Sequence, residues 1–175
     1  MFINEYGSRE DPTIILLAPM MVSGADLYHL MKPNFQNAYH VIAPDQGGHG
    51  KAGAYISADD EYQTLRAFLL ETDCREIALV YGASLGVAVA YRLFFDPAFH
   101  IAHAWFDGVA LCENARFPEW FMKKLFRSRK KKLAKTKAEL TIRKGFAHCG
   151  YMAAHPKEYV EEIETFLRRR PDVLG

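Results

Sequence analysis

A serine stands at the centre of the segment GASLG, at positions 82–86. The apolar run 77–81 before it has the length of a buried strand, and apolar residues recur at helical spacing over 87–95. A Gly-x-Ser-x-Gly turn between a strand and a helix is typical of a nucleophile elbow, which exposes the serine hydroxyl at the edge of a sheet. The pattern therefore predicts that Ser84 is a nucleophile. The alternative is an ordinary serine in a tight strand-to-helix turn.

The composition sets limits on the class of protein. The chain has 175 residues, half of them hydrophobic and a quarter charged, with a net charge of +1. This predicts one globular domain over 1–175, with no charge-based reason to expect a nucleic-acid partner. No apolar run is long enough to span a membrane, and the first residues show no signal peptide. Three cysteines outside metal-ligand spacing favour a cytoplasmic setting without a metal or cofactor.

Candidate strands and helices alternate along the chain. Alternation of this kind predicts an α/β fold, with a mostly parallel sheet covered by helices on both faces. The expected strands are 2–6, 13–18, 39–43, 77–81, 101–106 and 139–143, and the expected helices are 25–31, 57–72, 87–95, 117–137 and 155–170.

Four motifs follow one another in a characteristic order. They are a strand and loop over 13–24, the turn Asp-x-x-Gly-His-Gly at 45–50, the elbow at 82–86, and the segment GFAHCG at 145–150. In this order the chain resembles the α/β-hydrolase superfamily, from about residue 5 to residue 167. The resemblance implies the α/β-hydrolase fold in a minimal form and hydrolysis at a serine.

The resemblance also assigns roles to particular residues. Ser84 would be the nucleophile, and His148 the base that takes its proton and returns it to the leaving group. The backbone N–H groups of Leu85 and Met20 would form the oxyanion hole, because Pro19 has no N–H to donate.

The acidic member of the triad is the part of the pattern that departs from the family. Asp107 is the best candidate because it ends the strand next after the elbow, and Glu113 is the second choice. Segment 112–138 shows neither a clear strand nor a Gly-x-x-Asp turn, so the family's lid and usual acid are expected to be absent. Asp45 is interpreted as a turn residue bonding its own backbone, not as this acid.

Other residues near the motifs have structural interpretations. His49 is expected to bond within its glycine turn, and Cys149 is expected to pack, since sequence neighbours rarely point at each other. His155 is expected near the start of the last helix. Met20 and Met21 either line an acyl pocket or are ordinary exposed or core methionines.

Segment 123–137 carries nine Lys or Arg and no acidic residue. The favoured interpretation is a solvated basic helix in place of the lid, within 117–137. Such a charge run could also contact an anionic partner such as nucleic acid, lipid headgroups or an acidic protein, or could mark a deletion.

Two functions remain open at this point. The first is a serine hydrolase that cleaves a small ester or other acyl compound through an acyl-enzyme intermediate. The second is a catalytically degenerate α/β-hydrolase-fold domain that acts as a binding module. A sheet edge left by a missing strand could pair with a second copy, so a homodimer is also open.

Overall fold

The structure, a computed structural model, describes residues 1–108 and 149–168. Five strands form one sheet in the order β1-β3-β2-β4-β5, in which β1 is antiparallel to β3 and the other neighbours are parallel. The expected helix 117–137, the expected strand 139–143, Glu113 and His148 lie outside the described residues. The elements are β1 (Glu5–Tyr6), β2 (Thr13–Leu17), α1 (Gly24–Met31), η1 (Lys32–Asn34), β3 (His40–Ile42), α2 (Ala58–Glu71), β4 (Glu76–Ala83), α3 (Leu85–Phe94), β5 (His100–Asp107), α5 (Gly150–Ala154) and α6 (Pro156–Leu167).

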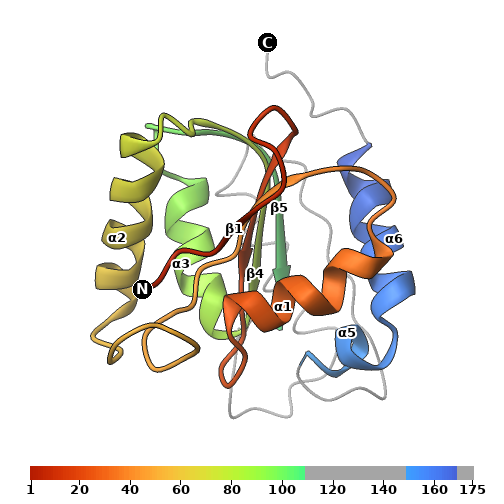
Figure 1. The fold of residues 1–175 in the computed structure, drawn as a ribbon, viewed down its shortest axis with the longest axis horizontal. Coiled ribbons are helices and arrows are strands. Elements are labelled where there is room, and N and C mark those ends of the chain that lie inside the picture. The colour runs from red at the N-terminus through yellow and green to blue at the C-terminus, as the bar shows by residue number, and fades with distance from the viewer. Residues whose placement is uncertain (109–148, 169–175) are drawn as a thin grey trace, which may run out of the picture.

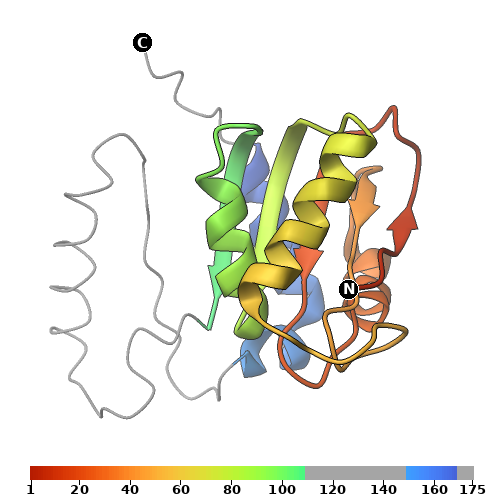
Figure 2. The ribbon, with the colours of Figure 1, turned by 90° about the vertical axis from the view of Figure 1, so that its left-hand side faces the viewer.

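Helices cover both faces of the sheet, as Figures 1 and 2 show. Helices α1, α5 and α6 lie on one face and α2 and α3 on the other. Each face has its own apolar core. Because β2 and β4 contribute alternate side chains to both cores, these two strands are apolar along most of their length. The predicted α/β class, with a mostly parallel sheet, is confirmed.

The start of α2 shows why the sequence folds locally as predicted. Ser57 has an extended backbone, and its Oγ accepts a hydrogen bond of 3.0 Å from the Asp60 N–H. This is the N-cap that the sequence predicts, with three acidic residues in the first turn of the helix.

Two features differ from the expectation. The predicted strand 2–6 is reduced to Glu5–Tyr6, because Phe2 forms just an isolated bridge with Asp45. The expected helix 155–170 corresponds to α6, and the short helix α5 before it is one that the sequence does not predict. His155 lies between them as the N-cap residue of α6, and Pro156 is at the first position of that helix, which suits a residue without an N–H.

A buried carboxylate anchors α6 to the rest of the domain. Glu164 is 1% exposed, and it accepts hydrogen bonds from the backbone N–H groups of Gln36 and Asn37, from the Asn37 side chain and from the Tyr39 hydroxyl. A buried charge of this kind is tolerated when several donors surround it. The position of α6 along the sheet is therefore fixed.

Both glycines of the elbow are required by close packing. A Cβ atom at Gly86 would meet the backbone carbonyl of Leu17, and one at Gly82 would lie 2.7 Å from the Ala90 Cβ. Neither contact can be relieved by rotating a long side chain. The two glycines therefore let α3 lie directly against β4 and the end of β2.

This packing makes a prediction about stability. Gly86→Ala should lower the free energy of unfolding by about 1–3 kcal/mol, since the added methyl group must displace backbone. Urea denaturation followed by circular dichroism would measure the change.

Gly53→Ala is the matched control, because a Cβ there meets nothing within 4 Å. It should stay within about 0.5 kcal/mol of the wild type. Equal midpoints for the two variants would contradict this account of the elbow.

Candidate active site

Ser84 has the backbone of a sharp turn. Its φ and ψ are 48° and −107°, between the last residue of β4 and the first residue of α3. A positive φ is strained for any residue with a Cβ, at a cost of about 1–3 kcal/mol. Strain of this kind persists where the surrounding structure enforces it, as Gly82 and Gly86 do here.

Three serines precede helices in the described residues, and they behave differently. The Oγ atoms of Ser23 and Ser57 cap α1 and α2, each accepting a backbone N–H at 3.0 Å. Ser84 occupies the same position before α3, yet its side chain makes no capping hydrogen bond. Serine at this position normally caps the helix. Ser84 is half-buried, and its hydroxyl makes no hydrogen bond to a described residue.

Asp107 is adjacent to Ser84 at the same edge of the sheet. Asp107 ends β5 and pairs with Ala83 in the parallel register with β4. The Ser84 N–H donates to the Asp107 backbone carbonyl at 3.0 Å. The structure therefore brings the predicted nucleophile and the predicted acid together at the carboxyl ends of two neighbouring strands.

The Asp107 carboxylate is held by a buried tyrosine. The Tyr159 hydroxyl donates to Asp107 Oδ2 at 2.6 Å, and the Trp105 Nε1–H donates to the Tyr159 oxygen at 3.0 Å. The Tyr81 hydroxyl lies 3.4 Å from the Tyr159 hydroxyl. Burial, followed by the neighbouring Tyr81 and the charge of Asp107, raises the pKa of Tyr159, so the phenol stays protonated and remains a donor.

Tyr159 is a site residue that the sequence does not reveal. It lies 52 positions after Asp107 in the chain, on the buried face of an amphipathic helix. Nothing in its local sequence distinguishes it from a core aromatic. Its role depends on the docking of α6.

Cys149 lies close enough to Asp107 for the charge of that carboxylate to act on its thiol. Burial, and then the nearby charge of Asp107, raises the pKa of the Cys149 thiol to about 11. The side chain packs against the core of the α1, α5 and α6 face, as expected for a packing residue. A protonated thiol is a poor nucleophile, so Cys149 does not compete with Ser84 for that role. Cys149 follows His148 directly in the chain, and His148 lies outside the described residues.

The loop of residues 18–22, here called the oxyanion loop, follows β2. The Gly86 backbone contacts Leu17, the last residue of β2, so this loop begins beside the elbow. The Val22 N–H donates to the Pro19 carbonyl at 3.3 Å, which closes a turn with Met20 and Met21 at its centre. Their side chains are 64% and 88% exposed. Neither the Met20 N–H nor the Leu85 N–H makes a hydrogen bond to a described residue, so both are candidate donors.

Side chains of the Asp-x-x-Gly-His-Gly segment make the hydrogen bonds within the turn that the sequence predicts. Asp45 is 1% exposed and accepts hydrogen bonds from the Lys51 N–H at 2.9 Å and the Asn4 side chain at 2.9 Å. His49 Nδ1 lies 3.0 Å from the Gly47 carbonyl, a bond within the turn.

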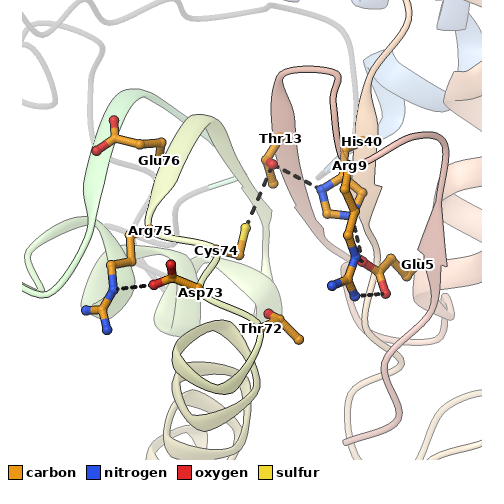
Figure 3. Close-up of a pocket in the computed structure, with 9 residues that line it drawn as sticks. All are labelled: Glu5, Arg9, Thr13, His40, Thr72, Asp73, Cys74, Arg75 and Glu76. Atoms are coloured by element: carbon orange, nitrogen blue, oxygen red, sulfur yellow. Dashed lines mark hydrogen bonds and ion pairs between the residues drawn. The ribbon is translucent and has the colours of Figure 1, made fainter.

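A cavity of about 420 Å³ lies at the opposite edge of the sheet, where β2, β3 and β4 begin (Figure 3). A hydrogen-bonded chain runs along it from Cys74 through Thr13 and His40 to Glu5, which also pairs with Arg9 at 2.8 Å. Burial raises the pKa of the Cys74 thiol. The charged groups of this cavity are paired with one another and the thiol is protonated. The cavity is therefore a weaker candidate for catalysis than the site around Ser84.

In residues 1–108 and 149–168, no three His, Cys, Asp or Glu side chains are grouped so that they could hold a metal ion. Within the same ranges, no helix combines the length and the apolar character that crossing a bilayer requires.

Solved structures share the fold of this chain, although no sequence family matches it. No protein-family model matches the chain, and no curated protein matches its sequence. Solved structures do match: an α/β-hydrolase family protein from Desulfitobacterium hafniense has a TM-score of 0.58 at 17% identity, over 89% of this chain and 62% of that one. An esterase from a marine microorganism has a TM-score of 0.54 at 19% identity, over 99% and 59%. A monoacylglycerol lipase from Paleococcus ferrophilus has a TM-score of 0.52 at 20% identity, over 74% and 51%.

The chain has the α/β-hydrolase fold, as its motifs predict. It spans less than two thirds of the length of each of these matched structures.

The environment of Cys149 provides a test of the site geometry. At a pKa of about 11, about one Cys149 thiol in a hundred is ionised at pH 9. Asp107→Asn removes the neighbouring negative charge, so it should lower this pKa and speed alkylation by iodoacetamide several-fold at pH 9. Mass spectrometry of the Cys149 peptide would follow the reaction separately from Cys74 and Cys112.

Asp59→Asn, on α2 at the far face of the sheet, is the control and should leave the rate unchanged. An equally unchanged rate in Asp107→Asn would show that its carboxylate does not act on this thiol.

Proposed function

We propose that this protein is a serine hydrolase that cleaves a small ester or other acyl compound through an acyl-enzyme intermediate. The observation that carries the proposal is the conformation of Ser84. This residue lies on a strained turn at the carboxyl end of β4, and its hydroxyl does not cap the helix that follows. The solved esterases and lipases that share the fold support a hydrolytic reaction.

In this proposal Ser84 Oγ attacks the acyl carbonyl carbon. His148 accepts the serine proton and delivers it to the departing alcohol, after which it activates the water that hydrolyses the acyl-enzyme. The negative charge on the carbonyl oxygen is stabilised by the N–H groups of Leu85 and Met20. Leu85 is the first residue of α3, so the positive end of the helix dipole adds to its effect.

Asp107 is the acid that we assign to His148. A neutral Tyr159 donates to one carboxylate oxygen at 2.6 Å, and no described residue donates to the other, which in this proposal accepts from His148. In this proposal the exposed residues Met20 and Met21 contact the acyl group.

Hydrolysis of a short-chain p-nitrophenyl ester tests the proposal. Ser84→Ala should lower kcat about 10⁴-fold or more, because no nucleophile remains. Asp107→Asn should also lower kcat strongly, by up to about 10⁴-fold, because the histidine loses its orientation and the imidazolium its stabilisation.

Asp73→Asn is the matched control for the acid, because Asp73 follows α2 at the opposite edge of the sheet. It should retain wild-type turnover. Equal hydrolysis by the wild type and Ser84→Ala, or none by either, would reject the enzyme and favour the degenerate binding domain.

A further inference from the structure

The turn at residues 45–50 contacts the oxyanion loop at two points. Gln46 Nε2 donates to the Ala18 carbonyl at 2.8 Å. The Met21 N–H donates to His49 Nε2 at 2.9 Å. These two hydrogen bonds hold the loop backbone on either side of Met20, the residue whose N–H we assign to the oxyanion hole.

The hydrogen bonds of His49 define which ring nitrogen carries the proton that it donates. Its Nε2 accepts the Met21 N–H, so the ring proton resides on Nδ1, where it donates to the Gly47 carbonyl at 3.0 Å. Both ring nitrogens are therefore occupied by backbone groups. His49 holds the loop and has no free nitrogen with which to reach a substrate.

The loop needs such support because its backbone is strained. Met21 has a φ of 68°, in the left-handed region that residues other than glycine seldom adopt. The cost is about 1–3 kcal/mol, and surrounding contacts must impose the conformation. The contact from His49 acts on the N–H of this same residue.

The turn that carries Gln46 and His49 is itself firmly anchored. The buried Asp45 carboxylate accepts the Lys51 N–H, which closes the turn, and the Gly47 N–H donates to the buried Glu61 carboxylate at 2.8 Å. The turn is therefore held in place on the side from which Gln46 and His49 bond the oxyanion loop.

Gln46 shows that this arrangement is maintained at a cost. Its Oε1 is buried and has no hydrogen-bond partner among the described residues. Leaving such an atom unsatisfied costs about 1–3 kcal/mol. An apolar side chain of similar size would avoid that cost, but it could not bind the Ala18 carbonyl.

We infer that Gln46 and His49 are positioning residues that preorganise the Met20 N–H for the developing oxyanion. The inference rests on the proposed function. It predicts that loosening the loop weakens the stabilisation of the transition state and leaves the binding of the ground-state ester largely unchanged.

Steady-state hydrolysis of a p-nitrophenyl ester by His49 variants tests this inference. His49→Phe keeps a ring of similar size but offers no acceptor, so kcat should fall about 10- to 100-fold while KM changes less than about threefold. His49→Gln restores an acceptor oxygen and should recover most of the loss. His100→Phe, at the exposed start of β5, is the control and should retain wild-type turnover.

A second variant separates loop positioning from a direct effect of the ring. Glycine adopts the left-handed backbone freely, so Met21→Gly removes the strain that the bond from His49 otherwise offsets. The change in kcat that Met21→Gly causes should therefore be more favourable in the His49→Phe background than in the wild type. If His49→Phe fails to fold, as urea denaturation would show, Gln46→Leu tests the other anchor and should produce the same loss of kcat at steady KM.

The outcomes distinguish the two proposals. Turnover that depends on Ser84 but is unaffected by His49→Phe and by Gln46→Leu would overturn the inference and leave the proposed function standing. Loss of kcat that His49→Gln does not rescue would also overturn it. Absence of any Ser84-dependent turnover in the wild type would overturn the proposed function, and the inference with it.

Discussion

The close approach of α3 to the sheet is the constraint on which the rest of the site depends. Gly82 and Gly86 allow this approach, and their neighbours leave no room for a side chain. Because the helix must start directly after the strand, Ser84 is forced to a positive φ and cannot cap α3. A hydroxyl that would stabilise a helix at an ordinary N-cap is thereby left available for chemistry.

The position of Asp107, the proposed acid, depends on a different set of contacts. Tyr159 reaches Asp107 from α6, and α6 is held in place by the buried Glu164 at its other end. Buried polar groups are costly unless they are hydrogen-bonded. The bond of Tyr159 to Asp107 and the bonds of Glu164 therefore both constrain the position of α6. The site thus joins the strand and elbow of the central sheet to a helix that follows much later in the chain.

The sequence predicts those features that are determined locally. The apolar runs of β2 and β4, the Ser57 cap and the turn at Ser84 follow from side-chain type and spacing, and the structure confirms them. No local pattern encodes contacts between distant segments. The bond of Tyr159 to Asp107 and the bonds of Gln46 and His49 to the oxyanion loop are contacts of this kind. The predictions for His148 and for segment 117–137 lie outside the described residues and remain predictions.

Backbone strain is concentrated where the chemistry is proposed. In the part of the chain that the structure describes, four residues other than glycine have a positive φ, and Met21, Ser84 and Cys149 are three of them. The fourth, Asp73, follows the C-cap of α2, where a left-handed residue commonly ends a helix. Met21 lies in the oxyanion loop, Ser84 is the proposed nucleophile, and Cys149 directly follows His148 in the chain. Strained backbone persists where surrounding contacts impose it, and a prearranged hydrolytic site requires the same rigidity.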